Sequence, residues 1–241
     1  MESDIKEFIE KHPSFSTVEF ADMLRTRTPG IARSTIYHSL KVLCNTGAIT
    51  RNRRGYFYST AKNEYYYELS DTAKELSAAI HKSYPLVDFQ IWELYQMNEF
   101  VNHLLAKNTI FIEAENMLDE SIFNILFSKY PHVLLNPSID EYYKYSGEET
   151  IVVQRLISEA PPSIGEYKQA SLEKILVDLF GRGLSGKIIS RSEYCAILED
   201  SFKKYNINQA KMFRYARRRG NEKAIRKYIE ENTYINLEEV K

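Results

Sequence analysis

The chain has 241 residues, of which 44% are hydrophobic and 27% charged, and its 32 Lys and Arg nearly balance its 33 Asp and Glu. This length and composition allow a buried core and exclude a disordered chain or a miniature disulfide scaffold. Only Cys44 and Cys195 occur, so neither a disulfide framework nor a zinc site is predicted. The sequence has no apolar run long enough to cross a membrane and no export-signal pattern at its start, so we expect a cytoplasmic protein that makes no use of a membrane.

Basic residues are concentrated near the N-terminus. Residues 1–62 hold ten basic side chains against six acidic ones, and residues 24–63 hold eight basic side chains and no acidic one. This local excess of positive charge favours a polyanion as partner. The alternative is a solvated basic loop, so the interpretation depends on the fold of this region.

Two helices are predicted at the start of the chain. Ile5, Phe8 and Ile9 have helical spacing, and Pro13 ends that helix. Ser16 with Glu19 has the spacing of a capping box, which starts a second helix. The flanking pair expected to form a hydrophobic staple is Phe15 and Phe20, and the residues expected to continue the buried face are Val18, Ala21 and Leu24.

A third helix and a hairpin are predicted next. The apolar stripe of the helix consists of Ile36, Leu40, Leu43 and Cys44, and Gly47 ends it. Residues 48–58 predict a β-hairpin whose basic turn covers residues 51–55.

The segment STIYHSLKVLCNTGAITRNRRGYFY resembles winged helix-turn-helix DNA-binding domains, with a recognition helix, a glycine turn and a basic wing. In that arrangement the helix reads base edges in the major groove, and the wing contacts phosphates or the minor groove. The residues expected to contact DNA are Arg33, Ser34, Thr35, Tyr37, His38, Lys41, Arg51, Arg53 and Arg54. One alternative is that Tyr37 and His38 are ordinary surface residues. Another is that the winged helix is a protein-binding module.

Residues 63–84 are predicted to be a linking segment between a domain at 1–62 and a larger domain at 85–241. Ser70 caps a helix in this segment. The run Tyr65-Tyr66-Tyr67 is interpreted as a half-buried strand or an interdomain contact in preference to a platform for stacking bases.

The larger domain is predicted to be α/β with a helical C-terminal bundle, which makes the chain as a whole α+β or α/β. Strands are expected over 87–94, 109–115, 132–136 and 148–157, with helices over 98–108 and 117–131. Four further helices are expected over 171–183, 190–205, 208–220 and 221–232.

Two motifs in this domain suggest chemistry and are interpreted structurally. Residues 181–187 have the glycine and lysine spacing of a phosphate-binding loop, but Ile188 replaces the magnesium-binding hydroxyl, so we expect a loop that ends a helix. Asp88, Glu113 and Glu115 could gather at a nuclease centre, but Glu113 is followed by Ala114, Glu115 and Asn116, so the lysine of the acid-x-Lys pattern is absent. We therefore expect them to be surface or hairpin-edge carboxylates.

Residues 201–228 carry ten basic side chains and one acid, which indicates either a solvated helical face or a second surface for anions.

The whole plan resembles AbiE-type antitoxins of type IV toxin-antitoxin systems. SLEKILVDLFGR is similar to their P-E-K-x-L-V-D-L element, with Leu172 in place of the proline, and NEKAIRKYIEE is similar to their closing helix. The resemblance implies a winged helix that binds inverted repeats in its own promoter. It also implies a C-terminal domain that counters a nucleotidyltransferase toxin without a stable complex. The residues assigned to the antitoxic role are Glu173, Lys174, Asp178, Arg214, Arg217 and Arg218.

The leading hypothesis is therefore an autorepressing DNA-binding antitoxin without catalysis, metal or cofactor, which pairs on DNA as a homodimer. One alternative is a winged-helix regulator whose larger domain senses a ligand. The other is a nucleic-acid-processing enzyme that depends on Glu113 and is delivered by the winged helix.

Overall fold

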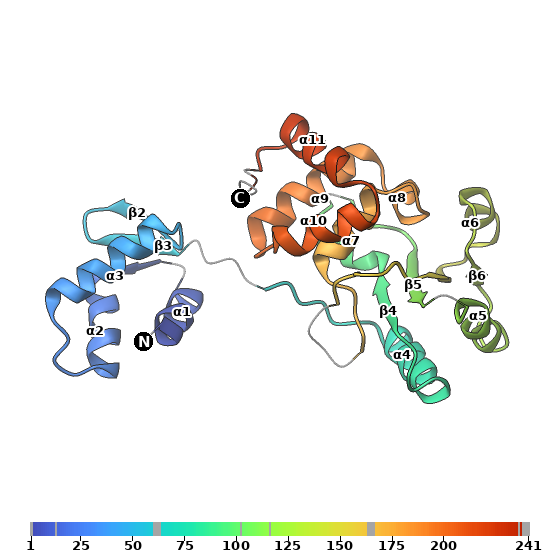
Figure 1. Ribbon diagram of the computed structural model, residues 1–241, viewed down its shortest axis with the longest axis horizontal. Helices are drawn as coiled ribbons and strands as arrows, with labels where there is room; N and C mark the ends of the chain where they lie inside the picture. The colour runs from blue at the N-terminus through green and yellow to red at the C-terminus, as the bar shows by residue number, and fades with distance from the viewer. Residues whose placement is uncertain are drawn as a thin grey trace. The chain divides into compact units, whose positions relative to one another are not determined.

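The computed structural model describes residues 2–12, 14–59, 64–101, 103–115, 117–162, 167–235 and 237, without the side chains of Glu10, Asn52 and Arg53. The chain divides into an N-terminal unit, Met1–Glu64 with Lys204–Asn206, and a larger unit, Tyr65–Lys203 with Ile207–Lys241. Figure 1 shows the elements of each unit. None of the helices in the described ranges is long and apolar enough to span a membrane.

The N-terminal unit has the winged helix-turn-helix topology. Its elements in chain order are α1 (Glu2–Lys11), β1 (Ser14–Ser16), α2 (Thr17–Arg27), α3 (Arg33–Asn45), β2 (Ile49–Arg53) and β3 (Tyr56–Ser59). The strands form an antiparallel sheet in the order β1-β3-β2. Helix α1 ends at Lys11, before Pro13, which was predicted to stop it and which lies outside the described residues.

Local capping signals position α2, with one correction to its buried face. The Ser16–Glu19 capping box is present, and the rings of Phe15 and Phe20 stack at 5.8 Å between centroids. Ala21 is buried as predicted, and so is Leu24. The prediction for Val18 was wrong, because its side chain is 65% exposed. At about 100° per residue, Val18 falls beyond the helical arc that faces the core.

The wing is a tighter hairpin than predicted. Strand β2 continues to Arg53, with a bulge between Arg51 and Arg53, so only Arg54 and Gly55 form the turn. Gly55 adopts φ +78°, a left-handed conformation that glycine tolerates at no steric cost. Its carbonyl accepts a hydrogen bond from the backbone N–H of Thr17 at 2.8 Å.

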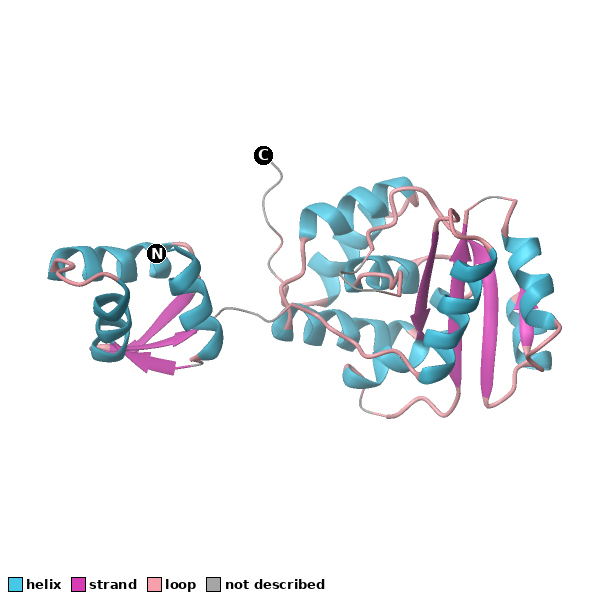
Figure 2. Ribbon diagram, turned by 90° about the horizontal axis from the view of Figure 1, so that it is seen from below, coloured by secondary structure: helices cyan, strands magenta, loops and turns pink. Residues whose placement is uncertain are grey.

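A mixed four-stranded sheet forms the centre of the larger unit. Its strands are β4 (Phe89–Glu93), β5 (Asn108–Ala114), β6 (Val133–Leu135) and β7 (Glu149–Arg155), in the order β4-β5-β7-β6. The β4 and β5 strands pair antiparallel, while β7 pairs parallel with both β5 and β6. Figure 2 shows helices on both sides of these strands.

The expected linking helix belongs to the larger unit. Helix α4 (Asp71–Ser83) buries Leu76 and Ile80 in the same cluster as Ile110 and Ile112 of the sheet. This apolar face explains why the helix packs on the sheet and does not serve as a connector. Helix α5 (Asp119–Phe127) contributes Ile122 to the same core.

The tyrosine run also packs within the larger unit, without forming a strand. The Tyr65 ring lies 5.9 Å from that of Phe100, and the half-buried Tyr67 contacts the core cluster beside α4. Tyr66 is exposed. Of the two structures expected for this run, the half-buried strand therefore does not form in the described residues.

The remaining elements include one further correction. The predicted helix over 98–108 does not form in the described residues, which contain a 3-10 helix, η1 (Leu94–Glu99), and a loop. Side-chain amides organise that loop: Asn98 accepts from the Leu105 N–H, and Asn108 accepts from the Tyr95 N–H. The other helices are α6 (Ile139–Tyr145), which was not predicted, α7 (Leu172–Phe180), α8 (Ser185–Ile188), α9 (Arg191–Lys204), α10 (Gln209–Arg218) and α11 (Glu222–Asn232).

Candidate nucleic-acid interface

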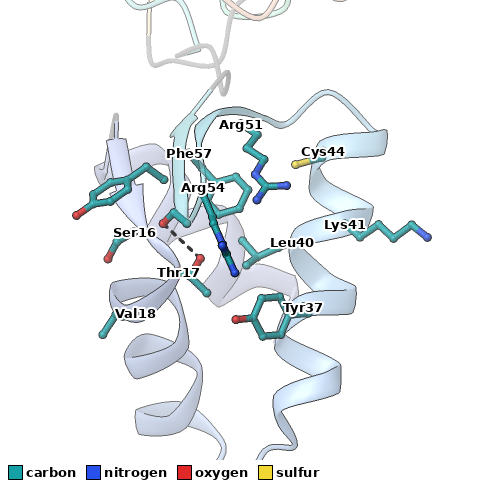
Figure 3. A pocket seen from close by; sticks show the side chains of 12 residues that line it. Ser16, Thr17, Val18, Tyr37, Leu40, Lys41, Cys44, Arg51, Arg54 and Phe57 are labelled. Carbon is teal, nitrogen blue, oxygen red and sulfur yellow. Dashed lines mark hydrogen bonds between the residues drawn. The ribbon is translucent and has the colours of Figure 1, made fainter.

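A groove of about 810 Å³ opens on the N-terminal unit between the start of α2, helix α3 and the wing. Figure 3 shows the side chains that line it. They are Ser16, Thr17, Val18, Tyr37, Leu40, Lys41, Cys44, Arg51, Arg54, Gly55, Tyr56 and Phe57. We refer to this feature as the wing groove.

The wing groove has an apolar floor and a cationic border. Leu40 and Phe57 are buried beneath it, while Tyr37 and Tyr56 keep nearly half of their surface exposed. Its charged lining residues are Lys41, Arg51 and Arg54, and the described lining contains no carboxylate. An exposed surface with this chemistry suits a ligand that is anionic along its edge and apolar between the charges.

The wing positions its cations through the backbone of the hairpin. In Figure 3 the Arg54 side chain extends from the wing into the space between α2 and α3. Tyr37 points from α3 toward α2, whereas Lys41 points away from the groove. The hydrogen bond from Thr17 to Gly55 attaches the turn that carries Arg54 to the first turn of α2.

The structure brings most of the predicted DNA-contact residues to one region. Arg33, Ser34 and His38 are exposed on α3 outside the groove, and Thr35 is half-buried. Tyr37, Lys41, Arg51 and Arg54 are exposed and line the groove. The side chain of Arg53 lies outside the described part of the structure.

Sequence reasoning missed the contribution of α2 and β3 to this region. Thr17 and Val18 line the groove from the first turn of α2, and Tyr56 lines it from the wing. Thr17 and Val18 directly follow the N-cap of α2. This position could have indicated that they line the groove, since a helix start beside a wing is exposed on one side.

Arg33 and Tyr37 form a side-chain pair on α3. Arg33 Nη2 donates to Tyr37 Oη at 3.5 Å, and the guanidinium carbon lies 5.6 Å from the centre of the tyrosine ring. The hydrogen bond, followed by the charge of the neighbour, raises the pKa of Arg33 and lowers the pKa of Tyr37. Arg33 therefore keeps its positive charge throughout the neutral range.

A buried ionic cluster lies in the larger unit. Lys174 Nζ lies 2.5 Å from Glu113 Oε1 and 2.7 Å from Asp178 Oδ2, and Lys174 has no solvent exposure. Burial alone would lower the pKa of the Lys174 ammonium, but the carboxylates of Asp178 and Glu113 outweigh it and raise the pKa.

Three more side chains satisfy the carboxylates of this cluster. Trp92 Nε1 donates to Glu113 at 3.0 Å, and Tyr215 Oη donates to Asp178 at 3.0 Å. Arg219 Nε lies 3.2 Å from Asp178 Oδ1 and is the most exposed member of the group. The cluster thus connects β5 with α7 and α10 by paired charges in the core.

The buried cluster corrects the interpretation of Glu113. Asp88 and Glu115 are exposed at the end of the β4-β5 hairpin, as predicted, but Glu113 is only 2% exposed. Its lysine partner comes from α7, 61 positions later, so no motif on the strand could indicate the pair. Across the described ranges, no three His, Cys, Asp or Glu side chains group as a metal site.

The residues assigned to an antitoxic role fall into two classes. Lys174 and Asp178 are buried, so they have no surface to offer a partner, and the half-buried Glu173 accepts a hydrogen bond from the Asn208 N–H. Arg214, Arg217 and Arg218 are exposed on α10. The antitoxic role itself stays a prediction from the sequence.

Much of the basic C-terminal run is engaged within the larger unit. Glu222 binds both Arg217 and Arg226, and the Arg226 guanidinium lies 3.6 Å from the centre of the Phe213 ring. Arg218 Nε donates to Ser158 Oγ. These contacts favour the solvated-face interpretation of the run over a dedicated surface for anions.

The glycine-rich segment ends α7, as predicted. The Gly181 N–H donates to the Asp178 carbonyl, and α8 follows within a few residues. A Cβ at Gly186 would lie 2.1 Å from the Gly181 carbonyl oxygen, so close backbone packing explains that glycine.

A family model matches residues 35–235, which include most of α3, the wing, the sheet and the C-terminal helices. The chain belongs to this family, a family of unknown function (DUF6577). The match begins within α3, so Ser16, Thr17 and Val18 of the wing groove lie outside it. No curated protein matches the chain.

Proposed function

We propose that the protein binds double-stranded DNA through the exposed face of α3 and the wing groove, and represses transcription from its own promoter. The observation that carries the proposal is the common position of Arg51 and Arg54 at one groove, with Lys41 directed outward at its edge, and a described lining that has no carboxylate. Cations gathered on one face release counterions from the DNA when they neutralise phosphates.

The fold supplies a shape that suits a duplex. A helix fits the width of the major groove, and exposed polar side chains on α3, such as Ser34 and His38, can reach base edges there. Arg51 and Arg54 on the wing would contact the adjacent phosphates or the minor groove. The protein would act in the cytoplasm, as a homodimer on inverted repeats, without a catalytic step.

The exposed Tyr37 and Tyr56 favour DNA over a wholly electrostatic surface for polyanions. Their rings line the groove beside the arginines, where the sugars and thymine methyl groups of a duplex are apolar partners. An inorganic polyphosphate has no sugar or base between its charges to contact these rings, so it should compete poorly with a specific duplex.

The proposal is tested with the full chain and a duplex that contains the DNA upstream of its own gene. We expect protection of repeated sequences in a footprint, and lower expression of a reporter fused to that DNA when the protein is present. Equal affinity for unrelated duplexes at physiological salt would contradict a repressor function. Small molecules that shift this affinity would point to the ligand-sensing alternative, and metal-dependent cleavage of the duplex would point to an enzyme.

A further inference from the structure

We propose that Arg33 reads a guanine in the bound DNA and that Tyr37 is its positioning residue. This inference rests on the proposed DNA-binding function, and it adds the base that the protein recognises and the pair of side chains that recognises it. It follows from the contacts of Arg33, which differ from those of the arginines on α2.

Arg33 is placed to reach base edges before the rest of α3. It is the first residue of the helix, and Tyr37 follows one turn later on the same exposed side. The N-terminal residues of a recognition helix are the ones that enter the major groove in helix-turn-helix proteins. Tyr37 also lines the wing groove, so the pair lies at the border of the proposed DNA surface.

The contacts of Arg33 hold its guanidinium without neutralising it. Arg25 pairs with Asp22 and Arg27 pairs with Asp4, so both arginines of α2 already have carboxylate partners. Among the described residues, Arg33 has no carboxylate partner and instead contacts the hydroxyl and the ring of Tyr37. A guanidinium has five N–H donors, and the hydrogen bond to Tyr37 uses one of them.

A guanidinium held in this way matches guanine. Its two parallel N–H groups fit the O6 and N7 acceptors of guanine, which is the commonest specific contact between a side chain and a base. The ring of Tyr37 limits the rotamers of Arg33 before binding, so less side-chain entropy is lost when the contact forms. Lysine at this position would keep the charge but lack the planar pair of donors.

The competing role for Arg33 is a phosphate contact, and the two roles predict different experiments. A phosphate contact weakens binding to all sequences equally when it is removed, and it lowers the salt dependence by about one ion. A base contact changes the preference at one position of the site and leaves the salt dependence nearly unchanged when a lysine preserves the charge.

The experiment first selects the preferred duplex for the full-length protein from a random pool. Affinities are then measured for that duplex, for guanine-to-adenine changes in it, and for a duplex with 7-deazaguanine, which lacks the N7 acceptor. The variants are Arg33→Lys, Tyr37→Phe and the control Lys41→Ala. All three positions are exposed, so unchanged thermal unfolding is expected and is measured alongside.

We expect the wild type to lose about tenfold or more in affinity on a guanine-to-adenine change at one position, and to lose affinity for 7-deazaguanine there. Arg33→Lys should reduce both differences, because an ammonium can reach O6 and N7 but lacks the planar pair of donors, and Tyr37→Phe should also reduce them. Lys41→Ala should weaken binding to every duplex by a similar factor. A selected site without a guanine preference, or a preference of undiminished size in Arg33→Lys, would overturn this inference. Failure of the wild type to bind any duplex would overturn the proposed function itself.

Discussion

The backbone N–H of Thr17 donates to the carbonyl oxygen of Gly55 at 2.8 Å, so the turn of the wing is fixed to the first residue of α2. Thr17 Oγ1 donates to the same carbonyl at 3.3 Å. This link sets the position of Arg54, which directly precedes Gly55 and enters the wing groove. The geometry of the wing therefore depends on the conformation of one glycine.

Replacing Gly55 by valine should destabilise the protein by about 1–2 kcal/mol and weaken DNA binding. The cost arises because φ +78° is unfavourable for a β-branched residue, while a Cβ there would make only an ordinary contact with Thr17. Thermal unfolding and duplex affinity check this. Gly55→Asn is the matched control, since asparagine tolerates this conformation, and a loss as large as that of valine would contradict the conformational explanation.

Replacing Ser16 by alanine should cost about 1 kcal/mol of stability. The Ser16 hydroxyl accepts the N–H of Glu19 at 3.2 Å, and alanine leaves that donor without its partner at the start of α2. The free energy of unfolding in urea measures the effect. Ser16→Asp restores an acceptor and should recover most of the loss, whereas equal stability of the alanine and aspartate variants would argue against the cap.

The Glu19 carboxylate gives the capping box a defined pH dependence. The backbone N–H of Ser16, followed by its side chain, lowers the pKa of Glu19 below its ordinary value of 4.5. A lowered pKa in the folded state means that the stabilisation is present above about pH 4.5 and is lost as the pH falls through the folded value. The difference in melting temperature between the wild type and Glu19→Gln should therefore shrink on acidification from pH 7 to pH 3. A constant difference would contradict the role of the charge.

Replacing Lys174 by methionine should destabilise the larger unit by about 3–5 kcal/mol, because it leaves the buried Glu113 and Asp178 carboxylates without their common cation. Unfolding in urea measures the loss. Adding Glu113→Gln removes one of the two buried negative charges that have lost their cation, while Tyr215 and Arg219 still bind Asp178. The double variant should therefore be more stable than Lys174→Met alone. Additive losses would contradict the coupling between these residues.

Local chemistry made the N-terminal unit predictable from the sequence. The capping box at Ser16, the apolar stripe of α3 and the glycine turn of the wing are each encoded within a few residues. Val18 was mispredicted because helical spacing alone does not define the width of the buried arc. Tyr56 was missed at the groove because its placement depends on how the wing packs beside α2.

Long-range pairing limited the prediction of the larger unit. Nothing near Glu113 indicates that Lys174 neutralises it, since only the packing of α7 on the sheet brings them together. Likewise, the described part of residues 98–108 does not form the helix that its pattern predicts, because Asn108 pairs in β5 and side-chain hydrogen bonds hold the preceding loop. Tertiary structure overrides local propensity in both places.

DNA binding at the wing groove should be visible in the salt dependence of duplex affinity. Affinity is measured from low to physiological salt for the wild type, for Arg51→Ala with Arg54→Ala, and for a control with the same charge change, Lys211→Ala with Lys223→Ala, at exposed positions of the larger unit. We expect loss of the two wing arginines to weaken binding to all duplexes and to make the negative slope of log affinity against log salt shallower by about two, while the control keeps the wild-type slope. An unchanged slope in the wing variant, or an equal reduction in both variants, would contradict DNA binding at the wing groove.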